Sequence, residues 1–214
     1  MQNTIPSLPL FQGMTNNEIA EVIADKTIQQ QRYAKNQVVV GHNQPSKGLL
    51  ILLDGRMCVS GKWKGGAYRT TEIVSSPCII EPERCFGLYQ RYQKQYVAKT
   101  ACSILYIPKS EVLKLTRTYM VFKLNLLNAV STIAQQRCAH LTEGVNEFHD
   151  SLLRFLTDHF LTGSTERKVY VTMNQLAETM HCSRLEISQA LNRLEQNCDI
   201  ILQRGIITLP SPNV

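Results

Sequence analysis

The sequence lacks the features that mark several protein classes. Its longest uninterrupted apolar run, residues 49–53, is far too short to cross a membrane. The first basic residue is Lys26, so no charged segment precedes an apolar stretch and we expect no secretory signal. A nucleophile elbow, a phosphate loop, an H-E-x-x-H motif and a readable acid pair are also missing. We therefore expect a cytoplasmic protein that is not an enzyme.

Cysteine pairs are missing as well, although the chain has seven cysteines, at positions 58, 78, 85, 102, 138, 182 and 198. No two of them form a C-x-x-C pair, which favours reduced thiols over a disulfide framework or a zinc site. Cys78 and Cys85 are seven residues apart, which leaves redox sensing or haem ligation open. Buried or idle thiols are the simpler interpretation. The histidines show no metal-ligand spacing, and we predict neither a metal site nor a cofactor.

Positive charge is abundant but unevenly distributed. The chain has a net charge of +6. Residues 145–214 contain six Lys or Arg against eight Asp or Glu, a net of −2, and residues 1–144 contain seventeen against nine, a net of +8. If the C-terminal part binds DNA, local placement of charge must achieve it, because its bulk charge does not.

The N-terminal half has the sequence pattern of an all-β domain. After a short helix that begins near Thr15, apolar runs from Val38 onward alternate with turn signals. The pairs Asp54-Gly55 and Gly65-Gly66 each predict a hairpin, because such turns need positive φ. Many short strands with this punctuation predict a sandwich or a closed roll of about a hundred residues.

The apolar period changes to that of a helix after Pro108 and continues for about thirty residues. The apolar face is long for one small roll to cover, which favours a dimer seam over packing on the chain's own domains. Gly144 is a candidate C-cap and hinge. The residues predicted for the dimer helix are Leu126, Leu127, Val130, Ile133, Ala134 and Leu141.

Two capping-box patterns, eleven residues apart, follow in the C-terminal part. Thr172 precedes Gln175 by three residues and Ser183 precedes Glu186 by three, so each pattern starts a helix. One short helix and a turn fit between them, which is helix-turn-helix spacing. His181 falls in the turn, where positive φ is expected. A strand before and a hairpin around Arg204-Gly205 after complete the pattern of a winged helix-turn-helix.

The helix that Ser183 opens has two opposite faces. Ile187, Ala190, Leu191 and Leu194 form an apolar stripe, but Leu185 points away from it. A helix in the major groove needs such an outward face, and a leucine there can contact a thymine methyl group. An exposed leucine that contacts nothing is the alternative. We predict base readout by Arg184, Leu185, Ser188, Gln189, Asn192 and Arg193, and phosphate contacts by Thr172, Ser183 and Arg204.

These segments resemble the bacterial regulators of the cyclic-AMP receptor and fumarate-nitrate regulator (CRP/FNR) family. "QLAETMHCSRLEISQALNRLEQ" with "IILQRGIITL" is similar to the winged helix of that family, and "KNQVVVGHNQPSKGLLILLDGRMCV" and "YVAKTACSILYIPKSEV" are similar to its sensor strands. The resemblance implies an α+β chain with a cyclic-nucleotide-binding-type β-roll (a double-stranded β-helix), a long dimerisation helix and a C-terminal winged helix-turn-helix. It also implies a homodimer on a two-fold DNA operator, with RNA polymerase as a further partner.

The chain departs from the family at its sensor. Leu88 stands where cyclic-nucleotide binders have a ribose-binding Glu, and Tyr92-Gln93 stands where they have Arg-Ser. Cyclic AMP is therefore not the expected effector. The family members that carry an iron–sulfur cluster have clustered cysteines near the N-terminus, whereas the first cysteine here is Cys58. We therefore expect no iron–sulfur cluster. Residues 56–99 have a net charge of +5, and Arg84, Arg91 and Lys94 are candidates for attracting an anionic effector.

The family's recognition helices also differ from this one. Arg184 is kept, but the Glu position is Leu185 and the final Arg is Gln189, so a different operator sequence is expected. The predicted divisions are residues 1–113 for the sensor with its N-terminal helix, 114–144 for the dimer helix and hinge, and 145–214 for the DNA-binding domain. The alternative is a ligand-binding or protein-interaction module whose winged helix does not bind DNA, which the net −2 of residues 145–214 supports.

Overall fold

The computed structural model describes residues 8–142, 148–161 and 163–210, and these residues pack into two compact units. The first unit holds the described residues up to 57 together with residues 75–135, and the second holds residues 58–74 with those from 136 onward. The second unit therefore includes a hairpin from the N-terminal half of the sequence, which the predicted division at residue 145 does not anticipate. None of the described helices is long and apolar enough to cross a membrane.

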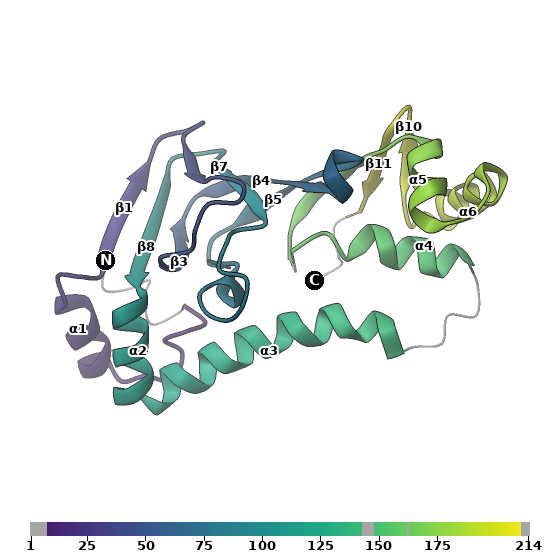
Figure 1. Ribbon diagram of the computed structural model, residues 1–214. Coiled ribbons are helices and arrows are strands. Elements are labelled where there is room, and N and C mark those ends of the chain that lie inside the picture. Colours follow the sequence, from purple (N-terminus) through teal and green to yellow (C-terminus); the bar gives the residue numbers. More distant parts are fainter. Residues whose placement is uncertain (1–7, 143–147, 162, 211–214) are drawn as a thin grey trace. The chain divides into compact units, whose positions relative to one another are not determined.

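The first unit is built on an antiparallel sheet in the order β1-β8-β3-β6, of which Figure 1 labels β1, β8 and β3. The strands are β1 (Gln29–Tyr33), β8 (Cys102–Pro108), β3 (Gly48–Asp54) and β6 (Cys78–Ile80), and β2 (Val38–Val40) pairs separately with β7 (Lys94–Ala98). Nearly all of β3 is buried. The β-rich domain that the sequence predicts is therefore present.

Asp54-Gly55 is not a hairpin turn, contrary to the prediction. β3 pairs with β6 and β8, whereas the next strand, β4 (Arg56–Trp63), belongs to another sheet, beside β5. The turn is a corner that moves the chain from one sheet to the other. Gly55 has φ of +100°, and a Cβ there would lie 2.4 Å from the carbonyl oxygen of Ala101, so the corner has no room for a side chain.

Helices cover the apolar side of this unit. They are α1 (Asn16–Ala24), α2 (Lys109–Thr118) and the first part of α3 (Met120–Thr142), with a short turn η2 (Pro82–Arg84) between strands. Thr15 and Glu18 form a complete capping box at the start of α1, so this helix begins where the sequence predicts it. The rings of Phe11 and Phe122 lie 5.6 Å apart in the core, which fixes the start of α3 against the roll.

The helical stretch after Pro108 is two helices rather than one. Tyr119 is extended between them, with φ −116° and ψ 107°, and its hydroxyl donates to the Glu21 carboxylate. The long helix therefore begins at Met120, not at residue 114. Of the predicted dimer residues, Leu126 packs partly on the unit's own core, while Leu127 is 58 % exposed. Gly144 lies outside the described residues, and the side chain of Leu141 is not described.

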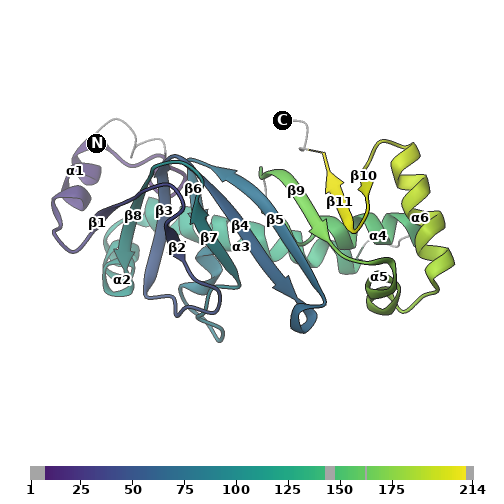
Figure 2. The same cartoon turned by 90° about the horizontal axis from the view of Figure 1, so that it is seen from above.

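The second unit joins the hairpin of β4 and β5 (Tyr68–Ser75) to the C-terminal elements. These are α4 (Phe148–Thr157), β9 (Thr165–Tyr170), α5 (Met173–Met180), α6 (Arg184–Gln196), β10 (Ile201–Gln203) and β11 (Ile206–Leu209). Gly65 and Gly66 both have positive φ, and β4 and β5 are neighbours in one sheet, so the hairpin predicted there is confirmed. The sheet continues through β5-β9-β11-β10, and Figure 2 shows β5 running beside β9.

The hairpin is part of the core of the second unit. Tyr68 is buried in one cluster with Leu152, Leu156 and Val169, and its hydroxyl lies 2.7 Å from Nε2 of His159. Because the other ring nitrogen of His159 faces the carbonyl of Phe155, it must donate there, and the neutral ring then accepts from Tyr68. Burial raises the pKa of Tyr68 to about 12, so its hydroxyl stays a donor at neutral pH.

Candidate nucleic-acid interface

The two helices expected in the C-terminal part are present and correctly capped. The Thr172 hydroxyl accepts from the Gln175 N–H at 3.3 Å, and the Gln175 side chain accepts from the Thr172 N–H at 2.8 Å. Ser183 and Glu186 repeat this exchange at 3.2 Å and 2.8 Å at the start of α6. These hydrogen bonds lower the pKa of Glu186, so the cap is fully ionised at neutral pH.

A tight turn fixes α5 against α6. His181 adopts the left-handed conformation with φ 54° and ψ 44°, as its place in the sequence predicts. Its N–H caps α5 through the carbonyls of Ala177 and Glu178. Leu176 of α5 packs in the same core cluster as Ile187 of α6, so the two helices share one core.

The two faces of α6 differ as the sequence predicts. Ile187, Ala190, Leu191 and Leu194 are all buried. Leu185, on the opposite face, is 66 % exposed. The other predicted readout residues surround it: Arg184, Gln189, Asn192 and Arg193 are exposed, and Ser188 is half-buried.

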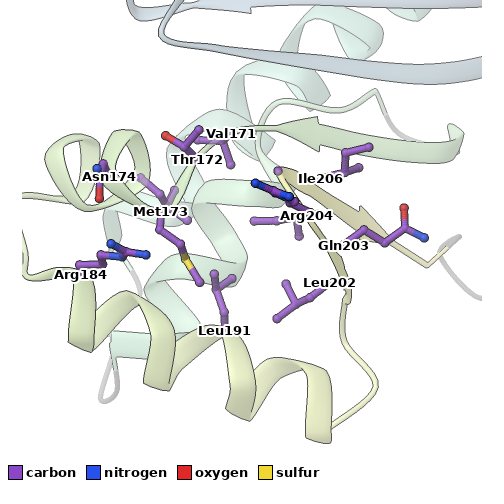
Figure 3. A pocket seen from close by; sticks show the side chains of 13 residues that line it. Val171, Thr172, Met173, Asn174, Arg184, Leu191, Leu202, Gln203, Arg204 and Ile206 are labelled. Carbon is purple, nitrogen blue, oxygen red and sulfur yellow. The ribbon is translucent and has the colours of Figure 1, made fainter.

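The residues predicted to hold phosphates come from three different segments. Thr172 lies at the start of α5, Ser183 at the start of α6, and Arg204 in the turn between β10 and β11, where Gly205 has φ of 75°. The structure brings Thr172, Arg184 and Arg204 to the rim of one pocket, whereas Ser183 does not line it. Figure 3 shows the two arginines approaching this pocket from different elements.

Sequence reasoning missed several residues of this surface. Asn174 and Gln203 are exposed at the same pocket, and Met173 lies between the arginines. A second groove of about 340 Å³ beside α6 is lined by Phe148 and His149 together with Gln189 and Arg193. The helical pattern gives no signal for either contact, because the partners come from elements distant in sequence.

The candidate effector residues of the first unit are already engaged by the protein. Arg84 lies 3.7 Å from the carboxylates of both Glu81 and Glu83 and donates to the Gln93 side chain at 2.8 Å. Arg91 donates to the carbonyl of Asn43, and Lys94 is buried. These positions do not make a group of free exposed cations, and an effector site at them stays a prediction.

Glu81 organises this segment. Its carboxylate accepts from the N–H groups of Gln93 and Lys94 and from the hydroxyl of Tyr96. Burial nevertheless raises its pKa, which means that desolvation outweighs these hydrogen bonds. Leu88, which the sequence resemblance aligns with a ribose-binding Glu, is an apolar side chain that is 85 % exposed to solvent.

Comparison with known proteins supports the reading of the fold. Residues 30–119 match the family model of the cyclic nucleotide-binding domain. The catabolite activator protein of Thermus thermophilus has a similar structure, with a TM-score of 0.52 and 16% identity over 94% of this chain and 93% of that one. The sensor domain of the regulator DNR from Pseudomonas aeruginosa is similar with a TM-score of 0.53 and 15% identity, over 69% of this chain and 95% of that one.

No curated protein sequence gives a significant match. At these identities the structural likeness establishes the fold and nothing further. The chain thus contains a cyclic-nucleotide-binding β-sandwich with helices and shares its overall architecture with the catabolite activator protein type of structure.

Proposed function

We propose that this chain is a homodimeric, sequence-specific DNA-binding transcription regulator with a C-terminal winged helix-turn-helix. The observation that carries the proposal is the outward face of α6, where Leu185 is 66 % exposed directly opposite a buried stripe. A packed helix gains nothing in folding by exposing a leucine among polar side chains, whereas a helix in the major groove uses such a face. The regulator-type fold supports the same reading.

Base readout is assigned to the exposed face of α6 and phosphate contact to its surroundings. Gln189 would bond an adenine edge, and Leu185 would contact a thymine methyl group. Thr172, Ser183 and Arg204 would bind the phosphate backbone of the DNA and would not contribute to sequence specificity. Selection of bound sequences from a random duplex pool tests this directly, because a two-fold dimer must enrich half-sites one helical turn apart.

Point variants separate readout from backbone contact. Gln189→Ala is expected to reduce the free energy of binding by about 1–3 kcal/mol through the loss of discrimination at one base pair. Arg204→Ala should weaken binding to all sequences alike. Gln29→Ala, an exposed glutamine in β1, is the matched control and should leave both affinities unchanged. An equal loss on specific and random duplex for Gln189→Ala would contradict the readout assignment.

The dimer is proposed to form through the exposed face of α3. Leu127 of the predicted seam is 58 % exposed, and Met120 and Leu124, which the sequence prediction did not include, are 60 % and 49 % exposed. The spacing of four and three residues from Met120 through Leu124 to Leu127 is that of a coiled-coil seam. Leu127→Arg should convert the dimer to a monomer in analytical ultracentrifugation. Leu113→Arg, on the exposed side of α2, should not. A monomeric wild type would remove this part of the proposal.

The effector is proposed to be a compound other than cyclic AMP. Leu88 cannot bind a ribose hydroxyl as a Glu does, and Tyr92, where the family has Arg, is buried with its hydroxyl on the Gly48 carbonyl. Thermal-shift screening of cyclic AMP beside phosphorylated and carboxylated metabolites tests this. Stabilisation by cyclic AMP would overturn it, and stabilisation by an anion that Arg91→Ala abolishes would support the predicted site at Arg84, Arg91 and Lys94.

A protein-interaction module is the second candidate, because residues 145–214 have a net charge of −2. A gel shift on random duplex at low and high salt separates the two. DNA binding that falls steeply with salt supports the regulator, since phosphate contacts release counterions. Absence of binding at every salt concentration supports the interaction module. As a regulator, the chain would act in the bacterial cytoplasm with RNA polymerase as a further partner.

A further inference from the structure

A cavity of about 420 Å³ opens between α5, α6 and the β10–β11 hairpin. This volume falls within the range of about 300–1,000 Å³ that small-molecule sites occupy. Its floor consists of the buried side chains of Leu176, Leu191 and Ile207, while Met173, Leu202 and Ile206 are half-buried around it. The cavity therefore presents apolar surface that gains free energy when a ligand removes it from water.

Two guanidinium groups stand at the rim of this apolar cavity. Arg184 comes from the first turn of α6 and Arg204 from the turn of the hairpin, and Figure 3 shows them on either side of Met173. Both side chains are exposed, and within the described part of the chain neither has a protein hydrogen-bond or ion-pair partner. None of the residues that line the cavity is acidic. The rim is thus locally cationic, although residues 145–214 have a net charge of −2.

An apolar cavity with two cations at its rim is complementary to an amphipathic anion. Its hydrocarbon body fills the cavity, and its charged end accepts charge-assisted hydrogen bonds from the guanidinium groups. Asn174 lines the same cavity, whereas the Gln203 side chain points away from it in Figure 3. A neutral ligand would use only the cavity, and a small inorganic anion would use only the arginines.

We propose that this cavity binds a small amphipathic anion, an aromatic or aliphatic carboxylate or sulfonate. Binding is a property of the protein alone and does not depend on the proposed DNA binding. If the chain does bind duplex, the anion and the phosphate backbone compete for Arg184 and Arg204, and the ligand acts directly on the reading surface.

Fluorescence titration of the full chain with 8-anilinonaphthalene-1-sulfonate tests the proposal. The probe combines an aromatic body with one sulfonate and brightens when its body leaves water. We expect saturable binding of one probe per subunit in the cavity. N-phenyl-1-naphthylamine, which has the same aromatic body without the sulfonate, should bind more weakly and should not respond to the arginine variants.

The variants locate the site. Arg184→Gln with Arg204→Gln should weaken sulfonate binding about tenfold or more, because both charge-assisted hydrogen bonds are lost. Arg193→Gln removes one positive charge on α6 away from the cavity and is the control for a loss of charge elsewhere on the helix. Met173→Glu places a carboxylate inside the cavity and should abolish binding. An acidic residue in the first turn of a helix is favourable, so α5 should remain folded, as circular dichroism will verify.

Three outcomes would overturn the proposal. The first is sulfonate binding that is unchanged in both the double arginine variant and Met173→Glu. The second is a loss that follows Arg193→Gln instead, which places the probe in the groove beside Phe148 and His149. The third is a loss in Leu88→Ser with Tyr89→Ser, two exposed apolar residues of the first unit. Probe binding that persists in a chain that fails to bind DNA would leave this inference standing and remove the proposed function.

Discussion

The segment from Glu81 to Lys94 and the cavity between α5, α6 and the β10–β11 hairpin are both lined by arginines, but the environments of those arginines are opposite. Arg84 is paired with Glu81 and Glu83 and donates to Gln93, and Arg91 donates to a backbone carbonyl. Arg184 and Arg204 have no such partners among the described residues. A ligand at the first segment must displace a protein partner, whereas one at the second replaces only water. The comparison therefore favours α6 and its surroundings as the surface prepared for an external partner.

The largest expected effect comes from a substitution on the buried side of α6, which packs on the core of the second unit. Ile187 is fully buried, and Ile187→Ala is expected to destabilise the second unit by about 2–5 kcal/mol, because the cavity it leaves relaxes only partly. Leu185→Ala, on the exposed face of the same helix, should change stability by less than about 0.5 kcal/mol while lowering DNA affinity. Urea denaturation measures the first quantity and a gel shift the second. A large stability loss for Leu185→Ala would mean that its face is structural.

The cap of α6 gives a smaller effect. Ser183→Ala removes the hydroxyl that accepts from the Glu186 N–H, and a lost N-cap costs about 1 kcal/mol. Ser183→Asp, which can still cap, should restore the stability. Ser183 is also a predicted phosphate contact, so the aspartate should recover folding without recovering DNA affinity. Recovery of both would assign Ser183 to capping alone.

The smallest effect concerns the segment from Glu81 to Lys94, and it appears as a change of stability with pH. Because burial raises the pKa of Glu81 above its ordinary value of 4.5, the stability that its protonated form contributes is present below pH 4.5 and is lost as the pH rises through the raised value. The urea midpoint of the wild type, relative to that of Glu81→Gln, should therefore fall as the pH rises above 4.5. Glu178→Gln, at an exposed position, should show no such difference. A constant difference would mean that Glu81 is ionised in the folded chain without cost.

Hydrogen bonds between residues close in sequence made the starts of the C-terminal helices predictable. A Thr or Ser three residues before Gln or Glu creates its own hydrogen-bond exchange, and both exchanges are present at the predicted positions. The positive φ of His181, Gly65 and Gly205 also follows from the turn that each must make. The division of α6 into a buried stripe and an exposed face needs only the helical period, so it too was predictable.

Other features depended on partners that no local pattern encodes. Asp54-Gly55 has the composition of a hairpin turn, but β3 finds its partners in β6 and β8, so the turn became a corner between sheets. Leu126 belongs to the predicted seam by period, yet packs partly on its own unit's core because Phe122 fixes the start of α3 there. The pocket between Arg184 and Arg204 exists only because a helix start and a hairpin turn meet.

The sequence by itself determined the helix starts, the tight turns and the face that α6 leaves outward, since hydrogen bonds within four residues and allowed φ values decide them. Only the tertiary structure decided that β5 would pair with β9 and bring Tyr68 into the C-terminal core. Strand pairing and burial join residues about a hundred positions apart, as Arg69 and Tyr170 show. The free energy of such a contact depends on which surfaces are left to cover, and that is a property of the whole fold.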